Sequence, residues 1–180
     1  MAASVEEAEG DEVVGRAEAV GDPGEEPELG VDALGEPVGE PVGHAGDDPN
    51  AVLLDAPCSS TGTIRRHPDV AWTKSPQDVA KLAKLQFDML GKAVEFVRPG
   101  GVLVFSNCSL LAVEGEALAK RAASEIAALE PYPVTPQELP GLETLVTTEG
   151  WLRSTPADMV LGRPEISGMD GFFAARFRVR

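Results

Sequence analysis

Residues 51–63 read AVLLDAPCSSTGT, and this stretch decides the fold of the chain. The apolar run at residues 51–54 stops at Asp55, and Pro57, Cys58 and several small hydroxyl residues follow. Four or five apolar residues bounded by turn-forming residues are typical of a strand buried on both faces of a parallel sheet. The sequence therefore predicts a carboxylate and a thiol at the edge where open α/β sheets bind ligands.

A second stretch repeats this design. Residues 101–105 read GVLVF, and the polar residues 106–109, SNCS, come directly after them. The chain has two cysteines, and each follows a predicted buried strand, so we expect Cys58 and Cys108 to lie side by side if the strands are neighbours. A disulfide between them is the alternative, although the sequence shows no secretion signal and two cysteines suit a reducing cytoplasm.

The segment between these strands predicts a helix. Ser75 and Pro76 form a good helix start, apolar residues then recur at helical spacing as far as residue 97, and Pro99 ends the pattern. Strand, helix and strand form a βαβ unit with a right-handed crossover. Further elements are expected as a helix over 113–129 and as strands over 144–147, 151–153 and 172–177, whose spacing suits an antiparallel hairpin at the sheet edge.

Charge divides the chain into two parts. The net charge of the 180 residues is -15, but residues 1–50 hold 15 acidic residues and a single basic one, Arg16, which leaves -1 for residues 51–180. Residues 1–50 also contain nine glycines, five prolines and no aromatic residue, so we expect this acidic segment to be disordered. No apolar stretch reaches the roughly 18 residues of a membrane span, and we expect a cytoplasmic protein without a membrane or metal partner.

The segment after the first strand reads as a loop with a basic pair. Arg65 and Arg66 could hold phosphates, because guanidinium groups match phosphate oxygens. Trp72 could stack on a base, but partly buried packing is the more common use of a single tryptophan. His67 lies beside a proline, and a surface role is the simpler interpretation.

Two thiols and a carboxylate in one cleft suit addition to a pyrimidine. A thiolate adds to electron-poor C6, C5 then accepts an electrophilic methyl group, and a second group assists release of the enzyme. A cysteine hydrolase is equally conceivable from chemistry alone. It would need a histidine as base within about 3 Å of a thiol, and His67 is the candidate, with Cys58 as the nucleophile.

Several motifs resemble one family. Residues 55–62, DAPCSSTG, followed by 65–69, RRHPD, resemble motif IV of the RsmB/Sun-type RNA cytosine-C5 methyltransferases. Residues 106–110, SNCSL, resemble motif VI of that family. Residues 150–156, GWLRSTP, and 169–176, MDGFFAAR, resemble the end of its catalytic domain.

The resemblance implies a fold and a reaction for residues 51–180. The expected fold is α/β, a partial Rossmann-like class I methyltransferase sheet with helices on both faces, forming the C-terminal portion of the domain. S-adenosylmethionine is implied as the methyl donor, and a cytosine in RNA, typically ribosomal RNA, as the acceptor.

The resemblance also implies residue roles. Cys108 would be the nucleophile that adds to the cytosine, and Cys58 would assist release of the methylated product. Asp55 would lie between the cofactor and the base, and Pro57 would shape the turn beside the cofactor. The basic pair at residues 65–66 would contact the RNA backbone.

The sequence also departs from the family pattern. Asn107 stands where the family more often has a small residue, and Gly115 stands where an asparagine between two acids is common, which would loosen the following helix start. Residues 1–50 lack the glycine-rich cofactor loop that the family needs, and a shifted reading frame would explain their composition. We therefore expect this chain to be a fragment with little or no activity; a non-catalytic RNA-binding module is the alternative.

Overall fold

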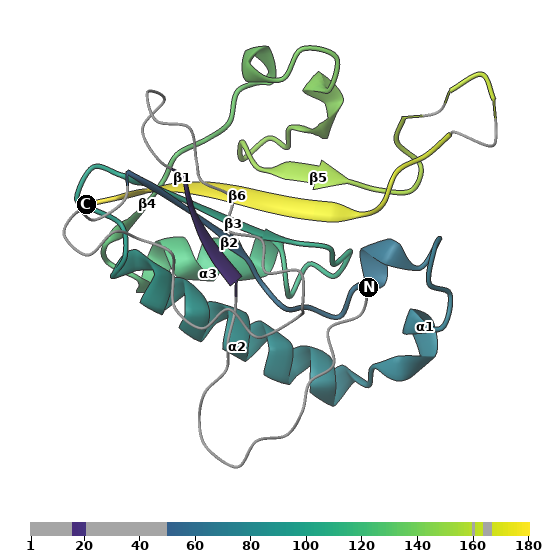
Figure 1. Ribbon diagram of the computed structural model, residues 1–180, viewed down its shortest axis with the longest axis horizontal. Helices are drawn as coiled ribbons and strands as arrows, with labels where there is room; N and C mark the ends of the chain where they lie inside the picture. The colour runs from purple at the N-terminus through teal and green to yellow at the C-terminus, as the bar shows by residue number, and fades with distance from the viewer. Residues whose placement is uncertain (1–15, 21–49, 160, 164–166) are drawn as a thin grey trace, which may run out of the picture.

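The protein is described by a computed structural model that covers residues 16–20, 50–159, 161–163 and 167–180. In these ranges six strands form one sheet in the order β1-β2-β3-β6-β4, and β5 also pairs with β6 (Figure 1). The strands are β1 (Arg16–Val20), β2 (Ala51–Asp55), β3 (Val102–Asn107), β4 (Leu129–Pro131), β5 (Leu152–Ser154) and β6 (Phe172–Val179). The helices are α1 (Val70–Thr73), α2 (Pro76–Val94) and α3 (Glu116–Glu125), with 3-10 turns η1 (Thr61–Thr63), η2 (Pro136–Glu138) and η3 (Glu143–Leu145).

The predicted βαβ unit is confirmed. β2 and β3 run parallel, and α2 connects them. Helix α2 begins where the sequence predicts, because Ser75 and Asp78 form a capping box and Pro76 occupies the first turn. Its inner face buries Leu90 and Ala93 in the core cluster that also contains residues of β2 and β3.

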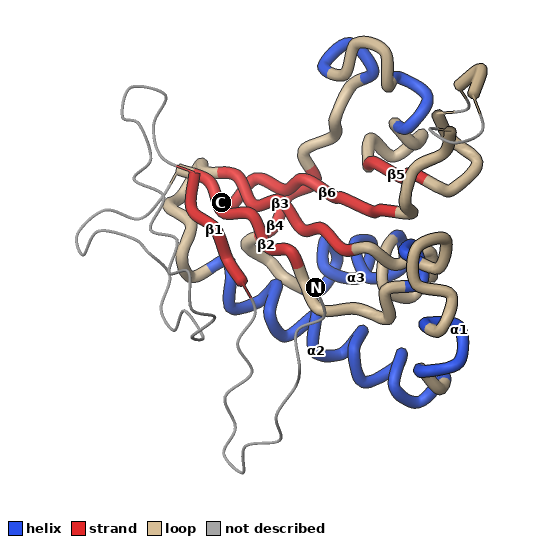
Figure 2. Tube along the Cα trace, turned by 45° about the vertical axis from the view of Figure 1, so that its right-hand side comes forward, coloured by secondary structure: helices blue, strands red, loops and turns tan. Residues whose placement is uncertain are grey.

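The helices are distributed unequally over the sheet. Helices α2 and α3 lie together on one face of the sheet, whereas the segment that contains the short turns η2 and η3 lies away from these helices, beyond strand β5 (Figures 1 and 2). Val52 and Leu54 of β2 are therefore buried, while Ala51 and Leu53 are only half-buried. The α/β class is confirmed. We had expected β2 to be buried on both faces, but it is fully covered on one face only.

Helix α3 is shorter than the predicted helix over 113–129. Residues 111–115 form turns in which Gly115 N–H bonds back to the carbonyl of Leu111. At the other end, Ile126 has an extended backbone, and Leu129 pairs with Val179 as the first residue of β4. The pairing with β6 ends the helix four residues early.

The C-terminal strands also differ from the prediction. Strand β6 is confirmed, but it lies between β3 and β4 and not at the sheet edge. The predicted strand over 144–147 is wrong for its first half, because η3 covers Glu143–Leu145 and only Val146 bridges to Leu152. Phe173, Ala175 and Phe177 fill the core from β6, and this burial favours a central place in the sheet.

Strand β1 lies within the segment that was predicted to be disordered. Arg16–Val20 pairs antiparallel with β2 and covers its outer edge. The rest of that prediction, for residues 1–15 and 21–49, lies outside the described residues. In the described ranges no helix combines the length and the apolar character that crossing a bilayer requires.

Candidate active site

The two thiols meet at the carboxyl edge of the parallel strands. Pairing of Asp55 with Ser106 brings together the turns that follow β2 and β3. Cys58 Sγ lies 3.5 Å from Cys108 Sγ, and both cysteines are free and half-buried. Ser106 Oγ donates to Asp55 Oδ1 at 3.1 Å. The prediction that both cysteines and Asp55 share one edge is confirmed, and no disulfide joins the pair.

Backbone hydrogen bonds hold the two cysteine turns together. Ala56 N–H donates to the Ser106 carbonyl at 2.9 Å, and Gly62 N–H donates to the Cys108 carbonyl at 2.8 Å. A third segment joins them, because Gly171 N–H donates to the Gly62 carbonyl at 2.8 Å. A Cβ on Gly62 would overlap the Gly171 carbonyl and lie 2.6 Å from the Cys108 oxygen. Only glycine fits this close approach.

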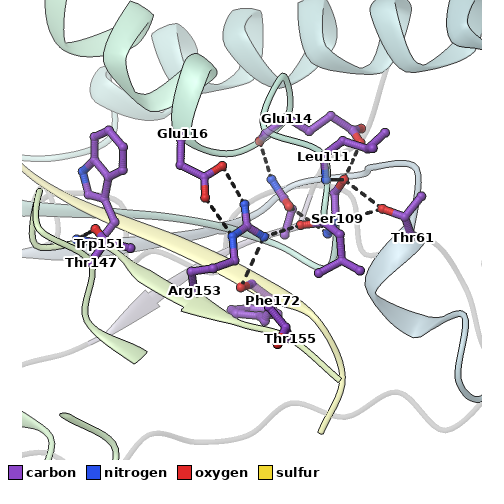
Figure 3. Close-up of polar contacts among 12 residues, drawn as sticks. Thr61, Ser109, Leu111, Glu114, Glu116, Thr147, Trp151, Arg153, Thr155 and Phe172 are labelled. Carbon is purple, nitrogen blue, oxygen red and sulfur yellow. Dashed lines mark hydrogen bonds and ion pairs between the residues drawn. The ribbon is translucent and has the colours of Figure 1, made fainter. Parts of the chain in front are cut away.

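A buried carboxylate lies beneath both turns. The side chain of Glu114 is fully buried, and its Oε1 accepts from Ser59 N–H at 2.9 Å and from Gln86 Nε2 at 3.0 Å. Its Oε2 accepts from Ser59 Oγ at 2.5 Å and from Ser109 Oγ at 2.6 Å. Figure 3 shows the side of this network around Ser109 and Thr61.

Two buried amides complete the network. Gln86 of helix α2 also donates to the carbonyl of Pro57 at 2.8 Å. Asn107 donates to the backbone carbonyl of Glu114 at 2.7 Å and accepts from Ser109 N–H at 2.9 Å. Asn107, which departs from the family pattern, therefore fastens the turn that carries Cys108.

Gly115 makes room for an arginine. A Cβ at this position would meet the guanidinium of Arg153 and would lie 3.1 Å from Phe173 Cγ. Arg153 pairs with both carboxylate oxygens of Glu116 at 2.9 Å and donates to the carbonyl of Ser109 (Figure 3). Gly115 is the N-cap of α3 and makes no side-chain capping bond, and its position packs closely against β5 and β6.

The two thiols differ in acidity. The hydrogen bond with Cys108, followed by burial, raises the pKa of Cys58 above its usual value. The hydrogen bond from Cys58 lowers the pKa of Cys108 to about 6; burial and the Asp55 carboxylate oppose this shift, and the Ser60 hydroxyl adds to it. These opposite shifts make Cys58 the partner that donates the S–H···S hydrogen bond and Cys108 the thiol that ionises more readily, and a thiolate is the better nucleophile.

The remaining predicted site residues lie around this pair. Asp55 and Pro57 are exposed at the sheet edge. Arg65 and Arg66 are exposed on the loop after η1. Arg66 Nε donates to Asp170 Oδ2 at 2.7 Å, and Arg65 lies 4.0 Å from the same carboxylate. The two arginines therefore already lie against one carboxylate, that of Asp170 in the segment before β6.

Two interpretations from the sequence need correction. Trp72 is 89% exposed on α1, so partly buried packing is wrong. The Cys58 thiol has Cys108 and Ser60 as its hydrogen-bond partners, and in the described part of the chain no hydrogen bond joins His67 to either thiol. The geometry thus gives no support to a cysteine hydrolase.

The sequence reasoning missed the residues that hold the site. Gln86 is polar yet sits on the inner face of α2, and a glutamine at that helical position was the available signal. Glu114 lay in a segment noted only for Gly115. Asp170 lay in a C-terminal motif without an assigned role, and nothing in the local pattern indicated that it pairs with Arg66.

The comparisons with known proteins agree with this geometry. Residues 41–178 match the family described as 16S rRNA methyltransferase RsmB/F. The chain belongs to this family. The motifs that resemble RsmB/Sun-type enzymes fall within the matched residues, so the recognition from sequence is confirmed.

Relatives within the RsmB/F family are named Ribosomal RNA small subunit methyltransferase B. The relative from Thermus thermophilus is 37% identical over 131 residues, which are 71% of this chain and 28% of the relative. The relative from Klebsiella pneumoniae strain 342 is 52% identical over 63 residues, which are 35% of this chain and 15% of the relative. The chain therefore spans less than a third of either relative.

The fold is shared with solved structures. A methyltransferase homolog protein from Pyrococcus horikoshii is 27% identical, with a TM-score of 0.51, and the match covers 74% of this chain and 40% of that protein. The Rossmann-like methyltransferase fold class predicted from the sequence is confirmed.

Proposed function

We propose that residues 51–180 supply the base-reacting side of an RNA cytosine-C5 methyltransferase. The observation that carries the proposal is the contact at 3.5 Å between Cys58 and Cys108, with Cys108 the more acidic thiol and Asp55 at the same edge. Membership of a family of 16S rRNA methyltransferases supports RNA, and ribosomal RNA in particular, as the substrate class.

The two thiols take different parts in the reaction. The Cys108 thiolate adds to C6 of the cytosine, and the electron pair displaced from the C5–C6 bond makes C5 nucleophilic. After C5 has gained its methyl group, water takes up the C5 proton, and the electron pair restores the double bond and expels Cys108 as thiolate. The protonated Cys58 thiol donates a hydrogen bond to the departing Cys108 sulfur and so assists this release. Asp55 polarises the base from the exposed edge.

S-adenosylmethionine would supply the methyl group. Asp55 and Pro57 are exposed beside the cysteine pair and fit the side of a donor site that faces the base. The outer neighbour of β2 is the antiparallel strand β1, whose last residue, Val20, pairs with Ala51 at the opposite end of β2. The described residues therefore do not form the adenosine side of a donor site.

The loop at residues 64–67 is the proposed RNA-binding segment. Arg65 and Arg66 are both about half-exposed, and each retains guanidinium N–H groups that face solvent beside the Asp170 carboxylate. They would contact phosphates that flank the target cytosine. The exposed Trp72 lies nearby in sequence on α1, which agrees with an RNA-facing surface.

Hydrogen exchange at C5 tests the proposal without a donor. Reversible addition of Cys108 to C6 makes the C5 hydrogen exchange with water, so RNA that carries tritium at C5 of cytosine should release it in the presence of the chain. Cys108→Ala should abolish the release, and Glu125→Ala, at an exposed site on α3, should preserve it. Equal release by wild type and Cys108→Ala would refute the proposed chemistry.

A second arm examines product release and the donor. If the chain methylates C5, Cys58→Ala should accumulate a covalent protein–RNA adduct on a denaturing gel, and the adduct should vanish when Cys108 is also replaced. A chain whose donor side is incomplete should give no such adduct. Addition of labelled S-adenosylmethionine should leave the RNA unlabelled if the donor side is incomplete. Methyl incorporation by this chain would overturn that expectation while supporting the reaction itself.

A further inference from the structure

Glu114 is an unusual residue to find in this core. Its side chain has no exposed surface, and in the ranges that the structure describes it forms no ion pair. A buried carboxylate costs free energy unless hydrogen bonds replace its water. Four donors from three residues supply these bonds. Ser59 and Gln86 come from segments distant in sequence, and Ser109 comes from the turn after β3, just before Glu114.

Two of the residues that donate to Glu114 are the direct sequence neighbours of the two cysteines. Ser59 directly follows Cys58, and it gives Glu114 both its backbone N–H and its hydroxyl. Ser109 directly follows Cys108, and it gives its hydroxyl to the same carboxylate oxygen as Ser59. One carboxylate therefore binds the residue next to each thiol, and the two serine hydroxyls lie 3.1 Å apart.

Helix α2 enters the same arrangement. The Gln86 amide donates to Glu114 and to the carbonyl of Pro57, the residue that precedes Cys58. Cys58 is thus flanked on both sides by residues tied to this network. The network joins α2, the turn after β2 and the turn after β3.

We propose that Glu114 is a positioning residue that keeps Cys58 and Cys108 in contact by binding the turn that follows each of them. It touches neither the base nor the thiols, and it acts through Ser59 and Ser109. The proposal rests on the proposed function for its catalytic meaning, because the thiol contact matters for methyl transfer only if both cysteines act on the base.

An apolar residue at position 114 could fill the same volume but could not satisfy the polar turns. Ser59 N–H and Gln86 Nε2 would remain buried without an acceptor, and the turns would have to move to reach water. Glutamine is the conservative substitution: its oxygen accepts from Ser59 N–H and Gln86, and its NH₂ group donates to the two serine hydroxyls.

Oxidation of the thiol pair measures the contact directly. Diamide takes up two electrons and two protons from the cysteines, and a Cys58–Cys108 bond forms with a loss of two hydrogens that mass spectrometry detects. The rate depends on how often the sulfurs meet. We expect Glu114→Ala to slow disulfide formation by on the order of tenfold or more, Glu114→Gln to stay near the wild-type rate, and Glu125→Ala to be unchanged.

Two further variants separate positioning from loss of folding. Circular dichroism first establishes that each variant is folded. If Glu114→Ala does not fold, Ser109→Ala decides, because it removes one hydroxyl donor and should slow oxidation severalfold. If Glu114→Ala does fold, adding Ser109→Ala to it should slow oxidation no further, since both substitutions remove the same Ser109–Glu114 hydrogen bond.

Two results would overturn the proposal. The first is that a folded Glu114→Ala variant forms the disulfide at the wild-type rate. If Glu114→Ala is unfolded, the same result for a folded Ser109→Ala variant counts instead. The second is a Glu114→Gln variant as slow as Glu114→Ala, which would mean that the polar contacts do not set the thiol geometry. Oxidation needs neither RNA nor donor, so failure of C5 exchange with these rates intact would refute the proposed function and leave the positioning role.

Discussion

Replacement of Gly62 by alanine tests how closely the cysteine turns must approach. Gly62 is buried between two carbonyl groups: it donates to Cys108 at 2.8 Å, and its own oxygen accepts from Gly171 at 2.8 Å. An added Cβ would lie 2.6 Å from the Cys108 oxygen, whereas ordinary contact begins at 3.4 Å. The atoms that must move are backbone atoms, so a side-chain rotation cannot relieve the clash.

The expected cost follows from these contacts. Overpacking of a filled site costs about 1–3 kcal/mol. The two backbone hydrogen bonds of Gly62 contribute about 0.5–1.5 kcal/mol each, and separating the turns stretches both. We therefore expect Gly62→Ala to lower the free energy of unfolding by about 2–6 kcal/mol, the upper end applying if both bonds break.

Urea unfolding followed by circular dichroism measures this cost. Gly91→Ala is the matched control, since no atom lies within 4 Å of its added Cβ and the position is inside helix α2. That variant should gain about 0.5–1 kcal/mol, because alanine favours the helix. A Gly62→Ala protein with the wild-type urea midpoint would show that the turns are not packed as described here.

Three further predictions concern charge and capping. Iodoacetamide should alkylate Cys108 with a pH midpoint near 6, because its thiolate forms as the pH rises through its pKa of about 6; a midpoint near the ordinary value of about 8.5 would contradict the thiol hydrogen bond. Arg153→Met should cost about 1.5–3 kcal/mol in a urea titration, since charge-assisted hydrogen bonds are lost. Burial alone would raise the pKa of Glu116, but the hydrogen bonds and charge of Arg153 together with a backbone hydrogen bond lower it on balance in the folded state. The loss should therefore be present at neutral pH and shrink as the pH falls below about 4.3. Ser75→Ala should lower stability by about 1 kcal/mol through the lost helix cap, and an unchanged melting temperature would refute the capping role.

Local patterns were sufficient for the first half of the fold. The run at residues 51–54, the cap at Ser75 and the run at residues 101–105 each identify an element from its own residues. Helix α2 connects β2 to a parallel neighbour, so the meeting of Cys58 with Cys108 followed from topology alone.

The second half depended on contacts between distant residues. The residues before Leu129 have helical spacing, but Leu129 belongs to β4, because it pairs with Val179 of β6. Phe173 alternates with its neighbours too weakly to identify a central strand, and only its packing against Phe105 and Trp151, with ring centroids 6.3 and 5.8 Å apart, makes its position clear. A strand's place in a sheet is a tertiary property.

The candidate site shows the same division at the level of single side chains. The thiols could be predicted because cysteine is rare in this chain and each one follows a strand. Glu114 could not, because a glutamate in a polar turn is normally solvated, and its burial is decided by Ser59 and Gln86 from other segments. The same holds for Asp170, whose partner Arg66 is 104 residues away in the chain.

The way the site is built separates two parts of the reaction. The thiol contact is held from beneath by Glu114 and from the side by Gly62, and both lie within the βαβ unit and its two turns. On the outer side of β2, the neighbouring strand in the described sheet is the antiparallel β1, whose last residue, Val20, pairs with Ala51 at the end of β2 away from Asp55. In the proposed reaction, the steps at the cysteines use residues that this structure describes, whereas methyl transfer needs a donor site that these residues do not complete. If this division is correct, C5 exchange should occur without methyl incorporation, and adding S-adenosylmethionine should leave the exchange rate unchanged.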